Sequence, residues 1–193
     1  MSALPQRNYI SEEEYLDMEE VSPVKHEYFD GEIFQMAGAS YKHNVAAGNA
    51  YASLHLQLRG RNCTPFQNDM RLLVEKTGLY TYPDVMIVCG KPEIKKYKGL
   101  DNILNPTLIV EVLSPSTADY DKGAKFDQYR TIESLKEYVL VWQDKKRVAR
   151  YTKQADNSWV LRDFIGEEAE IELASIECKL TIEDIYDKVD LEQ

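Results

Sequence analysis

Residues 107–113 read TLIVEVL, a run of apolar side chains that contains one carboxylate, Glu111. A continuous apolar run of this kind is typical of a strand that is covered on both faces. Because side chains alternate along a strand, we expect Glu111 to share a face with Ile109 and Leu113, and the other apolar residues to face the opposite way. A buried, ionised carboxylate without a partner costs several kcal/mol, so Glu111 requires a cation or a strong donor.

A second carboxylate stands at the start of another predicted strand. Asp84 follows Pro83 and opens the run DVMIV, where proline is tolerated because the first residue of a strand need not donate to the ladder. If this strand and 107–113 are neighbours, about 4.8 Å apart, Asp84 and Glu111 can converge on one hard cation. Mg²⁺, which prefers oxygen ligands, is the predicted metal, and Mn²⁺ can replace it.

An alternative explains the same two residues without a metal. Asp84 would cap a turn, and Glu111 would form an internal ion pair with Arg71 or Lys125. Structural ion pairs of this kind imitate functional ones, so the sequence leaves both explanations open.

Local signals predict the elements on either side. Ser11 and Glu14 form a capping-box pattern, and Asp30-Gly31 between two aromatic-containing runs is typical of a tight hairpin. The expected order is a helix from Ser11 to before Pro23, the hairpin, a helix over 41–60 capped by Ser40, extended runs at 64–75 and 80–89, a basic, mobile loop over 90–106, the strand 107–113, a helix over 121–133, a strand over 137–142, antiparallel strands over 147–153, 158–165 and 168–173, and a closing helix near 182–188.

Helical spacing groups side chains on each of the two longer predicted helices. On the helix over 41–60, one face is headed by His43 and continues with Ala47, Ala50, Leu54 and Leu58. On the helix over 121–133, one side carries Lys122, Lys125, Tyr129 and Ile132.

The length and the charge distribution of the chain limit its domain organisation and the kinds of partner it can bind. The 193 residues fit a single domain, predicted to span 1–193. The net charge is −10, with 2 basic and 9 acidic residues in 1–40, 4 and 12 in 151–193, and 17 and 12 in 41–150. Phosphate binding relies on clustered Lys and Arg, so a nucleic-acid partner requires a local cationic surface in the middle segment. A well-mixed surface is the alternative.

The N-terminal sequence and the use of cysteine are typical of an intracellular protein. The start, MSALPQRNYISEEEY, lacks a basic and then apolar leader, and no run approaches the ~20 apolar residues needed to cross a bilayer. We therefore expect a cytoplasmic protein without a membrane partner. Cys63, Cys89 and Cys178 are odd in number and far apart, so we expect no disulfide framework or zinc site, but ordinary small buried residues.

Several motifs together resemble a known pattern. Tyr82-Pro83-Asp84, followed after a variable loop by Glu111 in a strand, resembles the PD-(D/E)XK nuclease signature. A longer string is similar to the Uma-type family of restriction endonucleases: His26-Glu27-Tyr28, Asp30-Gly31-Glu32, Ser40, His43, YPDV, EVLSPST, Asp121, Lys125, Tyr129 and Glu137-Tyr138. The similarity covers about residues 25–150 and most of the C-terminal strands.

This resemblance implies a fold and an activity. The fold is a restriction-endonuclease-like α/β core of mixed β-sheet flanked by helices, with an N-terminal hairpin and a C-terminal β-meander. The activity is that of a nuclease, with metal carried by Asp84 and Glu111.

Two departures from the pattern bear on mechanism. The superfamily usually has a lysine two residues after the strand carboxylate, where it orients water and offsets phosphate charge, but here that residue is Leu113. The resemblance supports Lys125 as a migrated lysine, with Lys122 as the competitor and a solvated helix face as the alternative for both. At Val139-Leu140-Val141-Trp142 the chain lacks an Asp that relatives often carry at the end of this strand.

Other polar residues are weaker candidates. His43 is a candidate base or phosphate contact, or else a capping or packing residue. Glu27 would complete the metal shell from the hairpin, or else remain an exposed strand carboxylate. Ser114, Ser116 and Thr117 are expected to fix a turn rather than act as nucleophiles, because no GxSxG elbow accompanies them.

The leading functional prediction is an Mg²⁺-dependent DNA endonuclease that hydrolyses phosphodiester bonds. Asp84 and Glu111 would hold the metal, Lys125 would align or polarise the attacking water, and the 91–98 loop would touch the DNA backbone. A homodimer would match the two-fold symmetry of a duplex. Two alternatives stay open: a catalytically inactive nuclease-fold binding or regulatory module, and a metal-dependent phosphoesterase for a small molecule.

Overall fold

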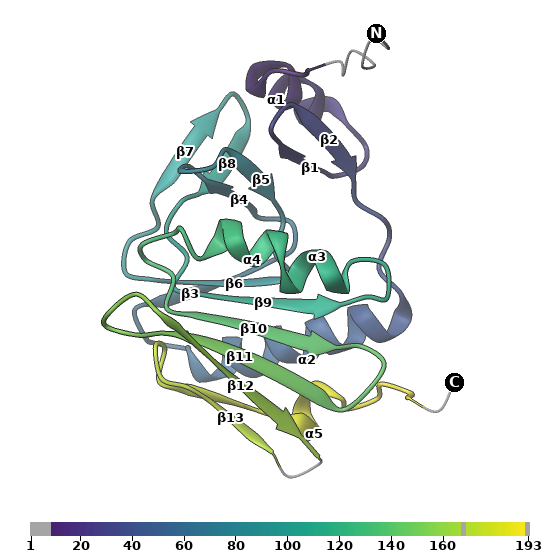
Figure 1. The fold of residues 1–193 in the computed structure, drawn as a ribbon, viewed down its shortest axis with the longest axis vertical. Helices are drawn as coiled ribbons and strands as arrows, with labels where there is room; N and C mark the ends of the chain where they lie inside the picture. Colours follow the sequence, from purple (N-terminus) through teal and green to yellow (C-terminus); the bar gives the residue numbers. More distant parts are fainter. Residues whose placement is uncertain (1–8, 167–168, 192–193) are drawn as a thin grey trace, which may run out of the picture.

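The computed structural model describes residues 9–166 and 169–191 (Figure 1). The helices are α1 (Glu12–Val21), α2 (Tyr41–Gln57), α3 (Ala118–Lys122), α4 (Ala124–Tyr129) and α5 (Ile182–Ile185). The strands are β1 (His26–Phe29), β2 (Glu32–Gln35), β3 (Cys63–Gln67), β4 (Arg71–Val74), β5 (Leu79–Thr81), β6 (Val85–Cys89), β7 (Ile94–Tyr97), β8 (Leu100–Ile103), β9 (Leu108–Leu113), β10 (Glu137–Trp142), β11 (Arg147–Lys153), β12 (Trp159–Ile165), β13 (Glu170–Leu173) and β14 (Cys178–Thr181).

Two six-stranded sheets organise the molecule. The upper sheet in Figure 1 has the order β2-β1-β5-β4-β8-β7, the lower sheet has the order β12-β11-β10-β9-β6-β3, and β13 pairs with β14. Both large sheets are mixed, because β9 runs parallel to β10 and β4 runs parallel to β8. The α3–α4 segment lies between the two sheets, and α2 lies on the other side of the lower one (Figure 1). The predicted mixed α/β architecture is confirmed.

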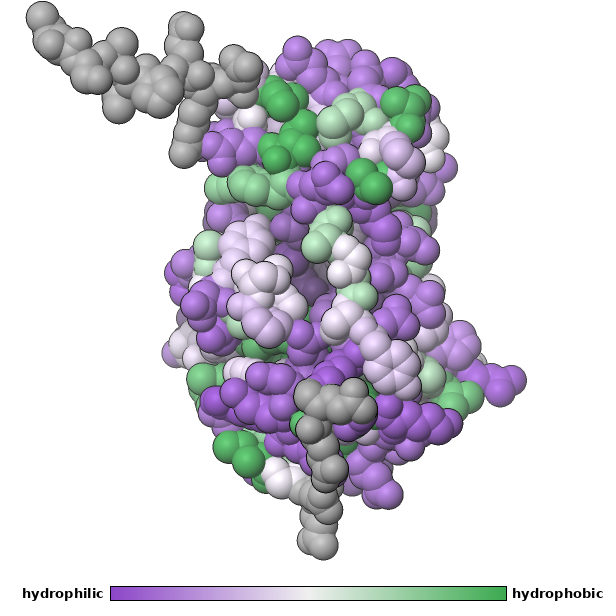
Figure 2. Space-filling model, turned by 90° about the vertical axis from the view of Figure 1, so that its right-hand side faces the viewer, coloured by the Kyte–Doolittle hydropathy of each residue, from purple (hydrophilic) through white to green (hydrophobic). Residues whose placement is uncertain are grey.

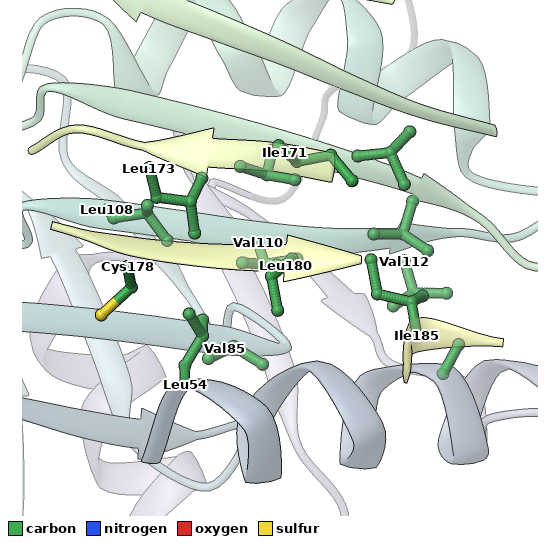
Figure 3. Close-up of a cluster of buried hydrophobic side chains, with 14 of the residues drawn as sticks. Leu54, Val85, Leu108, Val110, Val112, Ile171, Leu173, Cys178, Leu180 and Ile185 are labelled. Carbon is green, nitrogen blue, oxygen red and sulfur yellow. The ribbon is translucent and has the colours of Figure 1, made fainter. Parts of the chain in front are cut away.

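The central strand β9 shows the alternation that its sequence predicts. Leu108, Val110 and Val112 enter a cluster with α2, β13, β14 and α5 (Figure 3). Ile109 and Leu113 enter a second cluster with residues of α4 and β10. The strand is buried along its whole length, so the sheet holds Glu111 inside the protein.

The local signals of the N-terminal half are also confirmed. Ser11 and Glu14 form the capping box that opens α1, which ends before Pro23. Asp30 and Gly31 have φ values of 48° and 80° at the tip of the β1–β2 hairpin, as a tight turn requires. Ser40 caps α2.

The observed helices differ slightly from the predicted ones in where they end and in which residues they bury. Helix α2 ends at Gln57 rather than at residue 60, and Ala46 rather than Ala47 is fully buried. Helix α5 ends at Ile185, short of the predicted 188. In the described part of the chain, no helix is long and apolar enough to cross a membrane.

Both predicted extended runs in the middle of the chain are broken, and their halves belong to different sheets. The run 64–75 turns after Gln67 and becomes β3 and β4. The run 80–89 is interrupted at Tyr82-Pro83-Asp84 and becomes β5 and β6. Proline has no N–H to donate, which suits a point where the chain leaves one ladder and enters another.

The predicted basic loop over 90–106 is wrong, because it contains the β7–β8 hairpin. The two strands pair antiparallel, and β8 extends the upper sheet beside β4. The lysines of this hairpin lie against carboxylates: Lys95 is 3.2 Å from Glu12, and Lys96 is 3.7 Å from Asp101. Edge strands often carry charged side chains, so the polar sequence of this hairpin resembles that of a loop.

The predicted helix over 121–133 is divided at Gly123, and the predicted common side of Lys122 and Lys125 is wrong. Helix α3 begins earlier than expected, and α4 ends at Tyr129. Gly123 has φ −115° and ψ −97°, outside the helical region, so the two short helices point their side chains differently. Lys122 is at the surface beside Asp119, at 2.9 Å, whereas Lys125 is 5% exposed.

The C-terminal strands form a meander only in part. Strands β11 and β12 follow β10 antiparallel, as predicted. The next strand does not continue the lower sheet, because β13 pairs instead with β14, which the sequence interpretation missed. Residue 168, the predicted start of that strand, lies outside the described residues.

The prediction for the cysteines is wrong at two of the three positions. Cys63 and Cys89 lie directly opposite each other on β3 and β6 and form a disulfide. Strand pairing brings together two residues that are 26 positions apart in sequence, which spacing could not reveal. Cys178 is free and buried, as expected.

Glu19 connects three segments near the upper sheet. Its Oε1 accepts hydrogen bonds from the backbone N–H of His26, at 3.0 Å, and from the hydroxyl of Tyr82, at 2.7 Å. Its Oε2 lies 2.9 Å from Nδ1 of His26. Glu19 is 7% exposed, so its carboxylate ties α1 both to the hairpin strand β1 and to the segment between β5 and β6.

We predict that Glu19→Ala lowers the free energy of unfolding by on the order of 3 kcal/mol, because it leaves buried donors without an acceptor. Urea denaturation measures this. Glu20→Ala, which removes a neighbouring carboxylate from the surface, should change the value by less than about 0.5 kcal/mol. Equal effects of the two substitutions would contradict the anchoring role.

Candidate active site

Asp84 and Glu111 meet where β6 begins beside β9. The strands are antiparallel neighbours, with Val85 opposite Val110. The backbone N–H of Asp84 donates to Oε2 of Glu111 at 3.2 Å, and the backbone N–H of Val112 donates to Oδ2 of Asp84 at 2.8 Å. The predicted neighbourhood of the two strands therefore exists, and it places both carboxylates at one point of the lower sheet.

Lys125 brings a positive charge to this point from α4. Its Nζ lies 3.1 Å from Oε1 of Glu111, 2.9 Å from Oε1 of Glu27 and 3.5 Å from Oδ1 of Asp121. The hydroxyl of Tyr129, one helical turn further on, donates to Oε1 of Glu111 at 2.8 Å. The ammonium thus sits among three carboxylates contributed by β1, β9 and α3.

Glu27 reaches this cluster from the hairpin. Its side chain accepts a hydrogen bond from Thr81 at the end of β5 and pairs with Lys125. The residue is 9% exposed, so its alternative description as an exposed strand carboxylate is wrong. The upper sheet therefore contributes to a site built on the lower one.

His43 contacts the site from the first turn of α2. Its Nε2 lies 3.2 Å from Oδ2 of Asp84. Its Nδ1 is buried and has no hydrogen-bond partner among the residues that the structure describes. Burial by itself lowers the pKa of His43, but the hydrogen bond and charge of Asp84 outweigh it and raise the pKa above its ordinary value.

Burial and charge also shift the pKa values inside the cluster. Burial raises the pKa of Glu111 to about 8, with Lys125 opposing this shift and Asp84 and Asp121 adding to it. Burial disfavours the charged form of Lys125, yet the surrounding carboxylates, Glu111 first, hold its pKa well above its ordinary value. The lysine is therefore an ammonium at neutral pH, surrounded by acidic side chains.

The donor set fits a hard divalent cation. Within residues 9–166 and 169–191, no three His, Cys, Asp or Glu side chains form a ready-made metal cage. Mg²⁺ needs less, because it is commonly held by one or two carboxylates, waters and substrate phosphates. Asp84 and Glu111 supply such oxygens, and a bound divalent cation would favour the ionised form of Glu111 against the burial that raises its pKa.

Two sequence candidates lie outside this cluster. Lys122 pairs with the exposed carboxylate of Asp119, 2.9 Å away, instead of with the buried carboxylates of the site. Arg71, proposed as a partner of Glu111, instead donates through Nε to Asn102 at 2.6 Å. Its guanidinium faces the rings of three tyrosines: Tyr15, Tyr80 and Tyr82.

The sequence interpretation missed some members of the site. Asp121 and Tyr129 belong to the family-like motif without a predicted role, and nothing in the sequence indicates Thr81. For Tyr129, the signal was its helical spacing of four residues from Lys125, which places both on one face of α4. For Thr81 there was no signal, because its contact with Glu27 depends on the pairing of β1 with β5.

The site lies toward a hollowed side of the molecule. Strands β9 and β10 end on the right of Figure 1, where α2 begins. Figure 2 views this side directly and shows a hollow near its middle, where hydrophilic residues prevail. Asp84 is the more accessible carboxylate, with 12% of its side chain exposed against 5% for Glu111.

Comparisons with known proteins agree with the motifs. The sequence model of the Uma2 family, described as "Putative restriction endonuclease", matches residues 12–183. Two uncharacterized proteins of Synechocystis sp., sll1609 and slr1290, are 42% identical over 161 residues and 36% identical over 177 residues. The first alignment covers 83% of this chain and 90% of sll1609. The second covers 92% of this chain and 91% of slr1290.

A solved structure shares the fold. It is a protein from Anabaena variabilis ATCC 29413, described as a putative nuclease belonging to DUF820, and it superposes with a TM-score of 0.72 at 17% sequence identity. The match covers 90% of this chain and 96% of that one. The predicted restriction-endonuclease-like architecture is confirmed by this likeness.

We predict that Lys125→Met lowers the free energy of unfolding by about 3–5 kcal/mol near neutral pH, because it leaves buried carboxylates without their counter-charge. Chemical denaturation gives the value. Lys122→Met, on the adjacent helix, should change it by less than about 0.5 kcal/mol. Similar losses for both variants would show that the buried cluster does not depend on the ammonium.

His43 gives a prediction for pH dependence in metal-free protein. Because its folded pKa is raised above 6.5, its pairing with Asp84 contributes stability that is fully present below pH 6.5 and is lost as the pH rises through the folded pKa. The difference in unfolding free energy between wild type and His43→Gln should therefore shrink over that range. His55→Gln, an exposed site on the same helix, should show a constant difference.

Proposed function

Since the chain belongs to the Uma2 family, we propose that it is a metal-dependent endonuclease that hydrolyses phosphodiester bonds in DNA. The family and the fold support the coarser statement, a restriction-endonuclease-like nuclease. Metal, substrate and residue roles are our proposals, and they rest on the geometry of the cluster around Glu111.

Asp84 and Glu111 would hold Mg²⁺ or Mn²⁺. Once bound, the cation supplies stabilisation for the charge on a phosphate oxygen and promotes ionisation of a water. Asp84 is prepared for this role by two fixed contacts, the backbone N–H of Val112 and the imidazole of His43. Glu111 is oriented by the backbone N–H of Asp84 and the hydroxyl of Tyr129.

Lys125 would orient the attacking water and offset the charge of the phosphate. Its ammonium lies 3.1 Å from Glu111, so it occupies the surroundings that a lysine at residue 113 would otherwise reach. Glu27 and Asp121 hold the ammonium in place from the other sides. This contact between Lys125 and Glu111 is the observation that carries the proposal, because it supplies from α4 the cation that Leu113 cannot.

His43 would act mainly on Asp84. A hydrogen-bonded imidazole fixes the direction of the carboxylate, as second partners of metal-binding groups do. Glu27 contacts the lysine rather than Asp84, so we assign it to positioning Lys125 and no longer to the metal shell.

One observation favours a second candidate, a nuclease-fold module that binds without cutting. Glu111 is only 4% exposed and already has a cation beside it, as in a purely structural ion pair. In that case Lys125 would neutralise Glu111 permanently, and added metal would find no ligand there. Metal binding and cleavage therefore separate the two candidates.

We predict that the wild-type protein nicks supercoiled plasmid in Mg²⁺ or Mn²⁺ and that Asp84→Asn reduces the rate at least 100-fold, as loss of a metal ligand should. Glu111→Gln should do the same, and Lys125→Met should reduce the rate by about 10²–10³, the usual range for removing one preorganised group that stabilises developing charge. Gel electrophoresis of the plasmid forms measures the rate.

A second measurement distinguishes the activity of this protein from that of contaminating nucleases. Mn²⁺ should raise the melting temperature of the wild type but not that of Asp84→Asn, because a ligand that binds the native state stabilises it. Asp119→Asn, an exposed carboxylate on α3, should leave both readouts unchanged. Undiminished cleavage by Asp84→Asn would contradict the assigned site.

A further inference from the structure

The turn between β10 and β11 is rich in cations and begins with an aromatic side chain. Residues 144–147 read Asp-Lys-Lys-Arg, directly after Trp142 and Gln143. The guanidinium of Arg147 lies 4.3 Å from the centre of the Trp142 ring, and the ammonium of Lys145 lies 5.9 Å from it. We call Trp142, Lys145 and Arg147 the indole platform.

The strand register places this platform beside the carboxylate site. In the parallel pair β9–β10, Leu140 lies opposite Glu111 and Trp142 lies opposite Leu113. Opposite residues of neighbouring strands point to the same face, so the Trp142 side chain is on the face that carries Glu111. It lies one strand across from Glu111 and two residues further along the common direction of the two strands.

A hydrogen bond between neighbouring residues also links the platform to the site. The side chain of Gln143 accepts a hydrogen bond from Ser40 at 2.6 Å. Ser40 caps α2, the helix that carries His43, so the residue after Trp142 is fixed to the same element as the partner of Asp84. The platform and the site therefore have a defined relative position.

The platform suits a nucleic-acid strand. Lys145 is exposed, and its ammonium can contact a phosphate. Arg147 is held by a two-point contact with Asp163, at 3.0 and 3.1 Å, so its flat guanidinium is fixed against the indole. Aromatic rings and guanidinium planes are the surfaces on which unpaired bases stack.

We propose that the indole platform receives the nucleotide next to the scissile phosphate, with its base unpaired, and that this surface rather than the β7–β8 hairpin supplies the main cationic contact with the substrate. The proposal rests on the proposed function. Lys95 and Lys98 of the hairpin are paired with Glu12 and Asp17, as Arg147 of the platform is with Asp163. Lys145, exposed beside the indole, is therefore the platform cation that we assign to the phosphate. In a chain of net charge −10, the position of a local cationic surface beside the site decides where a polyanion binds.

The two tryptophans of the chain, Trp142 and Trp159, provide the test. Trp159→Phe leaves Trp142 as the only indole, and Trp142→Phe leaves Trp159. A short single-stranded DNA oligonucleotide of mixed sequence is titrated in EDTA, which prevents cutting. We expect saturable quenching of the emission in Trp159→Phe that added salt reverses, and little quenching in Trp142→Phe.

Matched lysine variants locate the phosphate contact. Lys145→Gln should weaken binding of the oligonucleotide several-fold, measured by fluorescence anisotropy of a labelled strand, and should lower the slope of log affinity against log salt by about 0.7. Lys96→Gln, which removes an exposed lysine of the β7–β8 hairpin, should change neither quantity.

The outcomes distinguish the platform from the proposed function. Oligonucleotide binding without quenching of Trp142, or equal effects of Lys145→Gln and Lys96→Gln, overturns the platform and leaves the endonuclease proposal standing. Quenching of Trp142 in a protein that cuts no plasmid supports the platform and overturns catalysis. Absence of both binding and cleavage overturns both proposals.

Discussion

The buried contact between the ammonium of Lys125 and the carboxylate of Glu111 is the interaction on which this structure depends. The central strand β9 is covered on both faces, so burial disfavours the ionised form of Glu111, and the ammonium that α4 places 3.1 Å away opposes that effect. Glu27 and Asp121 surround the same ammonium, so the hairpin, both short helices and the lower sheet share one electrostatic centre. Removing Lys125 leaves these buried carboxylates without their counter-charge.

The crossing of the chain between the two sheets forms the other half of the site. Tyr82-Pro83-Asp84 leaves the ladder of the upper sheet and joins that of the lower one, and Asp84 is positioned by the backbone N–H of Val112 and by His43. Tyr82 is held by Glu19, which also fixes the hairpin that carries Glu27. No single element brings the acidic residues together. They converge because contacts between the two sheets hold the sheets together at this point.

Much of this could be predicted where the signal is local. The alternation along β9, the capping box at Ser11 and the Asp30-Gly31 turn each depend on residues close in sequence, and each was found. The disulfide of Cys63 with Cys89, the β7–β8 hairpin and the contact of Thr81 with Glu27 depend on which strands pair, and no local pattern encodes that choice. Lys125 could be favoured over Lys122 only through family resemblance, because the break at Gly123 separates two lysines that an unbroken helix would place on one side.

The central claim is that Asp84 and Glu111 form the ligand pair of a metal site while Lys125 remains their neighbour. A crystal soaked in Mn²⁺ tests it most directly, through the anomalous scattering of the ion. The account predicts one strong peak about 2.0–2.2 Å from a carboxylate oxygen of each residue, the distance expected for a small divalent cation bound to oxygen. Glu111 still contacted only by Lys125, Tyr129 and the backbone N–H of Asp84, with no peak beside Asp84, would contradict it.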